Sequence, residues 1–271
     1  MVPLRQTSRV YPTLIRMATV DTPLHADATL FFFDARWPVL YVDNHLLAVY
    51  KPSGLLVQGD RTGDDCLLDL AKQWIKQRYD KPGKVFLAMV HRLDRPAAGI
   101  VLFARTSKAA GRLSRQFRER RVEKRYLAVV QGIVKNESGR LINHIERRGR
   151  LSRVVASPTT NSREARLRYR LIDNNTGHSL LEVSLETGRR HQIRLQLANL
   201  GYPIVGDLRY GAAKPLPGMQ IALLARHLSV DHPTQRNRVE LTCPIPQGWP
   251  WQAAEGSAAK RPPWDWRELN W

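Results

Sequence analysis

The sequence predicts an α+β fold, in which a few helices and loops flank a central mixed sheet that is mostly antiparallel. Three observations support this prediction. Short β-favouring runs outnumber helical segments, and most of these runs are joined by turn residues typical of hairpins. Hydrophobic residues make up 43% of the 271 residues, so the chain can bury a substantial core.

The expected elements follow one another as apolar patterns that turn residues interrupt. In order they are strands at 39–42 and 46–50, a helix through 67–74, strands at 85–90 and 100–104, a helix at 107–120, strands at 126–130, 163–171 and 180–185, a helix at 191–200, and strands at 223–230 and 239–242. Asp65 and Ser107 are the expected N-caps of the first two helices. Residues 135–160 are polar and are expected to form loops with at most one short strand.

The chain is expected to comprise an N-terminal arm at 1–38, one main domain at 39–245 and a Trp- and Pro-rich tail at 246–271. We expect the tail to pack loosely along the surface. No apolar run approaches the roughly 18 residues of a membrane span, and no secretory leader is recognisable. Cys66 and Cys243 each stand alone, which fits a reducing cytoplasm.

Charge is the strongest compositional feature. Lys and Arg number 43 against 24 Asp and Glu, which gives a formal net charge of +19. Such a field favours a polyanion, so nucleic acid is the expected partner, with a membrane surface or a merely solvated basic face as alternatives. The second expected helix carries four cations that either contact phosphates of the nucleic acid or are merely solvated: Lys108, Arg112, Arg115 and Arg118.

Three segments carry candidate chemistry. In 91–96 (HRLDRP) a carboxylate lies between cations at the end of a strand, either as a catalytic group or as an ion pair that ties the turn. In 187–194 (TGRRHQIR) a glycine and three arginines open a helix, either as an anion-binding site, which helix N-termini readily form, or as a basic helix start that is merely solvated. In 124–126 (KRY) a tyrosine starts a strand, a position more often filled for packing.

Metal and cofactor chemistry finds little support in the sequence. His91, Asp94 and His191 have no recognised metal-ligand spacing, and arginines beside them repel a cation. No phosphate-binding Gly-rich loop, dinucleotide fingerprint or nucleophile elbow is present. We therefore expect neither a metal nor a cofactor.

Taken together, these segments resemble the RluA-type pseudouridine synthases, which isomerise uridine within RNA. The resemblance covers about 39–245, with the family's motifs in order at 39–54, 91–106, 124–132, 185–194 with 201–211, and 227–233. It implies the family's catalytic domain, no cofactor, and a uridine in ribosomal or transfer RNA as substrate. A cytoplasmic monomer is the expectation.

The resemblance also implies roles for individual residues. Asp94 is the expected carboxylate at the ribose, paired with Arg189 and kept ionised by it, and Tyr126 is expected to stack on the uracil and assist removal of the C5 proton. Arg92 is expected to fill the gap left by the flipped base or to hold its phosphate, and Ile193 to form an apolar wall. The expected substrate-binding residues are Arg92, His91, Ile193, Arg194 and Lys51.

The sequence departs from the family pattern in places. Ala97-Ala98 replaces a Thr-Ser pair, which removes two hydroxyls from the catalytic loop, and Arg226 follows Ala225 where the family usually has Leu-His-Ala. The 38 residues before the first hairpin are too few for the small RNA-binding domain of many members. The catalytic domain is therefore expected to supply its own RNA contacts.

Three other functions compete with this interpretation. A relative that only binds RNA would bind without forming product. A metal-dependent RNA hydrolase using His91, Asp94 and His191 would lose activity with a chelator. A basic structural protein of a ribonucleoprotein would have no use for the three candidate catalytic residues together.

Overall fold

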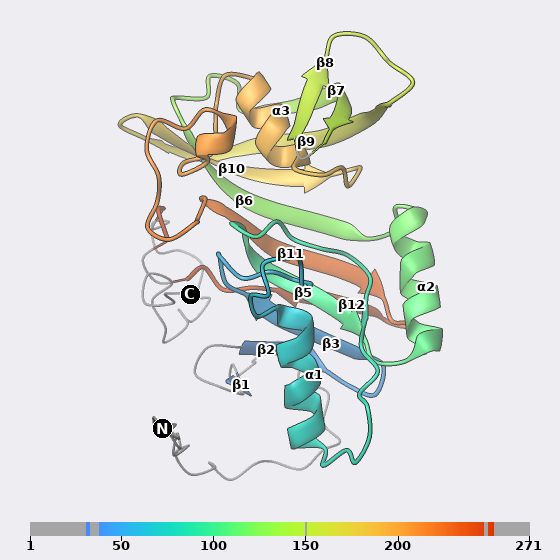
Figure 1. Ribbon diagram of the computed structural model, residues 1–271. Coiled ribbons are helices and arrows are strands. Elements are labelled where there is room, and N and C mark those ends of the chain that lie inside the picture. Colours follow the sequence, from blue (N-terminus) through green and yellow to red (C-terminus); the bar gives the residue numbers. More distant parts are fainter. Residues whose placement is uncertain (1–30, 33–37, 150, 247–248, 252–271) are drawn as a thin grey trace, which may run out of the picture.

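The computed structural model describes residues 31–32, 38–149, 151–246 and 249–251. Their strands form a 12-stranded sheet in the order β1-β2-β3-β5-β11-β6-β10-β9-β7-β8, with β12 on β11 and β4 on β5 (Figure 1). Every pairing is antiparallel except that of β11 with β5. The prediction of a mixed, mostly antiparallel sheet with helices is thereby confirmed.

The bounds of the strands agree with the apolar patterns in most places. They are β1 (Phe31–Phe32), β2 (Pro38–Val42), β3 (Leu46–Lys51), β4 (Ala88–Met89), β5 (Ala98–Ala104), β6 (Glu123–Gln131), β7 (Ser138–Arg148), β8 (Leu151–Val155), β9 (Ser162–Asn175), β10 (His178–Leu185), β11 (Leu223–Asp231) and β12 (Arg238–Thr242). β3 and β5 are buried along their whole length, as continuous apolar runs predict. β9 instead alternates buried and solvent-facing residues over 165–170.

Three α-helices and one 3-10 turn complete the described elements: α1 (Leu67–Arg78), α2 (Ser107–Arg118), α3 (Gln192–Asn199) and η1 (Leu208–Tyr210). The expected N-caps are corrected. Cys66 precedes α1 without a side-chain cap, and Thr106, not Ser107, caps α2 by accepting a hydrogen bond from the backbone of Ala109 at 3.2 Å. Cys66 and Thr106 both have extended backbones, which Ser107 inside the helix lacks.

Two expectations for the strands were wrong. Residues 135–160 hold the hairpin of β7 and β8, which extends the sheet at β9. The strand expected at 85–90 contracts to Ala88–Met89, because only these residues pair with β5.

The tail does not pack loosely where it is described. Trp249 and Trp251 are 4% and 5% exposed and belong to the main hydrophobic core. The other three tryptophans, at 264, 266 and 271, lie outside the described residues.

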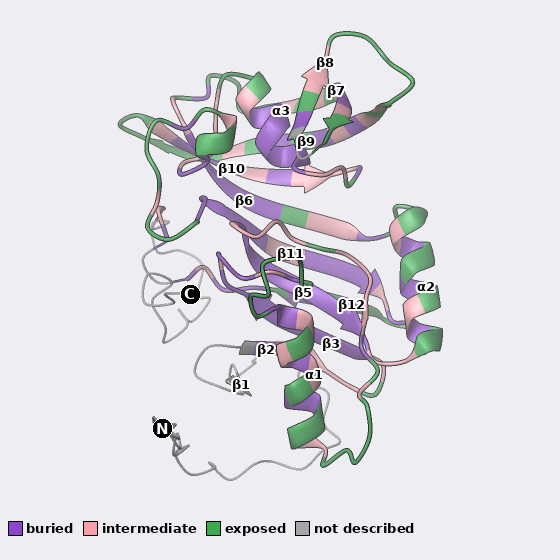
Figure 2. Cartoon of the chain, in the orientation of Figure 1, coloured by how far each residue is buried: buried purple, intermediate pink, exposed green. Residues whose placement is uncertain are grey.

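The core runs along the sheet through the middle strands, as the buried residues in Figure 2 show. The main cluster joins β3, β5, β11, β6 and β10, and a second cluster lies between β3, β5 and α1. Because both neighbours of β6 belong to this core, β6 provides a rigid platform for side chains at its beginning.

Candidate active site

A cleft of about 900 Å³ lies at the start of β6. Its walls come from 90–97 before β5, from 117–126 at the junction of α2 and β6, and from 184–194 between β10 and α3, with Arg166 and Leu223 completing it. The three segments with candidate chemistry, which are far apart in the sequence, therefore meet in one place.

Asp94 is held in this cleft by Arg194. Nη1 of Arg194 donates a hydrogen bond to Oδ2 of Asp94 at 3.1 Å. The Arg194 side chain is 5% exposed and that of Asp94 is 26% exposed, so the carboxylate faces the cleft while its partner lies behind it. Such a bond from a charged donor is stronger than a neutral one and fixes the orientation of the carboxylate.

The expected pairing of Asp94 with Arg189 is corrected by this geometry. Nε of Arg189 donates to the backbone carbonyl of Glu164 at 2.9 Å, and no salt bridge joins Arg189 to Asp94 in the described structure. The reason is helical geometry: Arg189 precedes α3 in the loop, whereas Arg194 lies inside the helix on the side that faces Asp94.

Arg194 is itself held by a second carboxylate. Nε and Nη2 of Arg194 donate to the two oxygens of Asp207 at 2.6 and 2.8 Å, and the Asp207 side chain is 1% exposed. The guanidinium also lies 5.0 Å from the ring centre of Tyr210. Asp207 and Tyr210 thus fix the fork of Arg194, which leaves Nη1 for Asp94.

His191 approaches the other oxygen of Asp94. Its Nε2 lies 3.8 Å from Oδ1 of Asp94, and its Nδ1 lies 2.7 Å from the Tyr210 hydroxyl. Burial lowers the pKa of His191 to about 4, in spite of the nearby Asp94, which raises it. His191 adopts a left-handed backbone with φ of 55°, a conformation uncommon outside glycine that turns the chain into α3.

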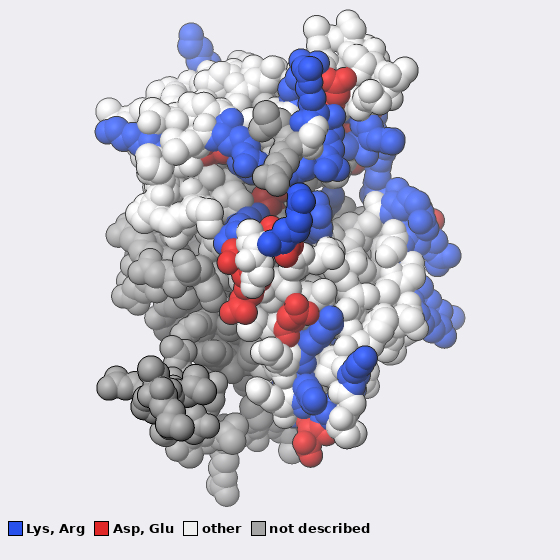
Figure 3. Space-filling view, viewed as in Figure 1, with Lys and Arg blue, Asp and Glu red and all other residues white. Residues whose placement is uncertain are grey.

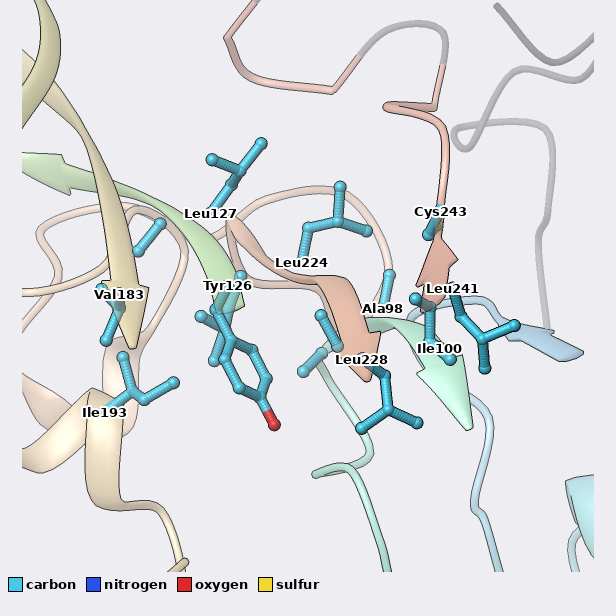
Figure 4. Packing of buried hydrophobic residues seen from close by; sticks show 14 of the residues in the cluster. Ala98, Ile100, Tyr126, Leu127, Val183, Ile193, Leu224, Leu228, Leu241 and Cys243 are labelled. Carbon is cyan, nitrogen blue, oxygen red and sulfur yellow. The ribbon is translucent and has the colours of Figure 1, made fainter. Parts of the chain in front are cut away.

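Tyr126 and Ile193 form an apolar wall of the cleft. Tyr126 is 7% exposed and Ile193 5% exposed, and both belong to the main core. Figure 4 shows the Tyr126 ring on β6 beside Ile193 on α3, with the hydroxyl pointing away from the core residues. Burial raises the pKa of Tyr126 above its ordinary value, and Asp94 adds to this shift.

His91 and Arg92 also belong to the lining of the cleft. His91 Nε2 accepts a hydrogen bond from the backbone of Leu102 at 2.9 Å, and its ring stacks on Phe117 with centres 5.1 Å apart. Burial lowers the pKa of His91 to about 3, so the imidazole is neutral near pH 7. Arg92 is exposed at the edge of the cleft, where it is accessible to a substrate.

Lys51 lies outside the lining, contrary to its expected place among the substrate-binding residues. It is fully buried, and its ammonium donates to the carbonyls of Pro52, Leu55 and Arg95 at 2.7, 2.9 and 3.1 Å. All three donors of the ammonium group are therefore used within the protein. Lys51 ties the loop after β3 to the loop that carries Asp94.

Cations surround the cleft. Its lining includes Arg118, Arg120, Arg121, Lys124, Arg166, Arg189 and Arg190. Carboxylates neutralise some of them: Arg166 pairs with Glu164 at 2.6 Å. In Figure 3 the Lys and Arg side chains gather around α2 and over the part of this face that holds β7 to β9. The pKa of Arg189 is lowered by burial first and then by neighbouring arginines, which indicates a local excess of positive charge.

Three residues of this arrangement were missed as site residues from the sequence. Asp207 and Tyr210 lie in the matched motif 201–211, and His191 was considered only as a metal ligand. A signal was available for Asp207 and Tyr210: a charged and an aromatic residue within a motif that otherwise forms a turn. Among the described residues, no group of three His, Cys, Asp or Glu side chains is placed to hold a metal ion. None of the described helices is long and apolar enough to span a bilayer.

The chain is similar in sequence to proteins of one known family. The family model described as RNA pseudouridylate synthase matches residues 45–199. Ribosomal large subunit pseudouridine synthase D of Xanthomonas campestris is 33% identical over 256 residues, which cover 90% of this chain and 75% of that protein. Its counterpart in Nitrosomonas europaea is 33% identical over 217 residues, and the match spans 77% of this chain and 62% of that protein.

Solved structures show the same fold. Human RNA Pseudouridylate Synthase Domain Containing 4 superposes with a TM-score of 0.66 at 24% identity and covers 77% of this chain and 88% of its own. Human RNA Pseudouridylate Synthase Domain Containing 1 superposes with a TM-score of 0.62 at 26% identity. The match covers 78% of this chain and 85% of that chain. The match of sequence and fold over most of the chain shows that this protein belongs to the RNA pseudouridine synthase family, and it is an isomerase.

Proposed function

We propose that this protein converts specific uridines of RNA to pseudouridine, with Asp94 as the carboxylate that acts at the ribose. One observation carries this proposal. The Asp94 carboxylate faces a cation-lined cleft, is oriented from behind by Arg194, and shares the cleft with Tyr126 and Ile193.

The chemistry needs few parts. The N1–C1′ bond breaks, the uracil rotates, and a new bond joins C5 to C1′. C5 gives up its proton to solvent and N1 takes one up, so no net oxidation occurs and the atomic composition of the RNA is unchanged. Asp94 acts either by attack on C1′ or by removal of the C2′ proton. The fork of Arg194, held by Asp207, keeps the reacting oxygens of Asp94 in one orientation for either route.

Tyr126 supplies a neutral aromatic surface in this proposal. The raised pKa of its phenol favours the protonated form near pH 7, which supports stacking on the flipped uracil. The same shift opposes a phenolate that removes the C5 proton. Ile193 packs beside the ring and covers the apolar edge of the base.

The substrate must be extruded from its stack, which costs a few kcal/mol. Cations at the cleft can offset part of this energy by binding the RNA backbone, and exposed Arg92 is placed to hold the phosphate or fill the vacated position. Ribosomal RNA is the first candidate, since relatives at 33% identity bear the name ribosomal large subunit pseudouridine synthase. Transfer RNA is the second.

The test uses ribosomal and transfer RNA transcripts tritiated at uridine C5, with EDTA present. Wild-type protein is expected to release tritium, while Asp94→Asn binds the same RNA and releases none. Asp65→Asn is the matched control, because Asp65 is an exposed carboxylate outside the cleft. Tight binding without release by wild type would favour the protein that only binds RNA. Chain cleavage that EDTA abolishes would favour the metal-dependent hydrolase.

A further inference from the structure

Lys124 is a cleft cation to which the proposed function assigns no particular contact with the substrate. It precedes Tyr126 by two positions on β6, so both side chains leave the same face of the strand, about 7 Å apart along it. Both line the cleft. A nucleotide whose base stacks on Tyr126 therefore brings its own backbone within reach of Lys124.

The Lys124 ammonium has no protein partner among the described residues, although the side chain is half-buried. Burial lowers the pKa of Lys124, and Lys124 in turn adds to the lowering of the His91 pKa. A cation removed from water without a counter-charge is unfavourable, and proteins usually pair such groups. Other cleft cations, such as Arg166 and Arg121, have carboxylate partners, whereas Lys124 has none in the described structure although its side chain is half-buried.

No described carboxylate forms an ion pair with the Lys124 ammonium, since Asp94 and Glu186 of the cleft lining are held by Arg194 and Arg140. His91 is neutral near pH 7, Arg120 and Arg121 bring positive charge from the end of α2, and Glu123 is paired with Arg125. From the loop before α3 comes Gly188, where a Cβ atom would lie 3.7 Å from Nζ of Lys124. The missing side chain at 188 leaves room beside the ammonium for a group from outside.

We propose that Lys124 is a substrate-binding residue whose ammonium binds a phosphate oxygen adjoining the flipped uridine. The inference rests on the proposed function, because it takes the base to lie on Tyr126. The phosphate on the 5′ side and that on the 3′ side share the same chemistry, and the experiment separates them. The contact anchors the nucleotide from the strand that also carries its stacking partner.

The experiment compares three RNAs of the sequence that wild-type protein modifies: one unaltered, one with a neutral methylphosphonate 5′ to the target uridine, and one with it 3′. Lys124→Met is expected to lower kcat/KM on unaltered RNA by about 10- to 100-fold, the range for a lost charge-assisted hydrogen bond. Lys124→Arg, which keeps the positive charge, should recover part of the lost kcat/KM. Lys135→Met, an exposed lysine outside the cleft, is the control and should match wild type.

The decisive result is that the effects of the methylphosphonate and of Lys124→Met on kcat/KM are not additive. At the contacted phosphate, the methylphosphonate should slow wild type strongly and Lys124→Met hardly further. Gly188→Ala should also lower kcat/KM, because its methyl group takes up space beside Nζ. Equal responses of wild type and Lys124→Met to both methylphosphonates would overturn the contact, while turnover of unaltered RNA by wild type would still support the proposed function. Absence of wild-type turnover would overturn both.

Discussion

Arg194 divides one guanidinium between two carboxylates, and this division decides which residue orients Asp94. Two of its nitrogens bind the buried Asp207, and the third binds Asp94. A planar fork of donors can satisfy both groups at once, whereas the point charge of lysine cannot. The orientation of the candidate catalytic carboxylate therefore depends on a residue whose own position is set from behind.

Arg194→Lys should consequently affect turnover more than binding. We expect kcat to fall at least about tenfold, since a misoriented reacting group loses much of the advantage of positioning. Arg189→Lys keeps a positive charge at the edge of the cleft and should change KM more than kcat. Single-turnover and steady-state tritium release would measure both. The opposite pattern would restore Arg189 as the partner of Asp94.

The sequence predicted which residues line the cleft better than it predicted which of them pair with one another. Asp94, Tyr126, Ile193 and Arg92 all line the cleft as expected. The choice between Arg189 and Arg194 depended on helical phase, and two arginines five positions apart cannot be distinguished by composition. Lys51 was expected among the substrate-binding residues, whereas its ammonium donates to three backbone carbonyls within the protein.

Among the elements, β5 shows how closely two strands approach behind the Asp94 loop. Gly99 on β5 pairs with Ala225 on β11 in the one parallel contact of the described sheet. It has φ of +120°, and a Cβ atom there would lie 2.4 Å from the Ala225 carbonyl oxygen. Backbone occupies the space that any side chain at 99 would need.

Gly99→Ala should therefore destabilise the protein by more than about 3 kcal/mol, from a clash with backbone added to an unfavourable φ. Gly111→Ala is the matched control: this glycine lies inside α2, and no atom lies within 4 Å of the place that a methyl group would take, so alanine should stabilise by up to about 1 kcal/mol. Urea unfolding followed by tryptophan fluorescence measures both changes. Equal stability of wild type and Gly99→Ala would show that the strands can separate at this point.

Strands that contain many buried apolar residues could be predicted from the sequence. Strands that are stabilised mainly by backbone hydrogen bonds to their neighbours could not. β3, β5 and β6 are rich in buried aliphatic residues, which the sequence displays directly. β7 has a single buried residue, Ile145, so its strand structure rests on hydrogen bonds to β8 and β9. Side-chain pattern carries little information about such a hairpin.

Across the whole molecule, positive charge is concentrated where the proposed substrate would lie. The chain carries a formal net charge of +19, and many of its cations lie around the cleft and α2 (Figure 3). The composition predicted a polyanion as partner, but only the fold separates cations of the cleft from those elsewhere. Arg118 lines the cleft, whereas Lys108 on the same helix does not, and both are exposed.

RNA binding should accordingly weaken with salt, by at least about tenfold between 50 and 200 mM, because bound phosphates release counterions. Arg118→Gln should reduce the slope of log affinity against log salt by roughly 0.7 to 0.9, the value for one phosphate contact. Lys108→Gln removes the same charge away from the cleft and should leave the slope unchanged. Titrations at several salt concentrations would show this, and equal slopes for all three proteins would mean that α2 is only solvated.

The ion pair of Asp94 and Arg194 also determines when the active site can form during synthesis of the protein. Its two members are 100 residues apart in the chain, and Asp207 follows later still. At a synthesis rate of about 5 to 20 residues per second, the loop with Asp94 leaves the ribosome roughly 5 to 20 seconds before its partner. A nascent chain therefore presents its carboxylate without the group that orients it, and competence to modify RNA must wait until Arg194 and Asp207 have both emerged.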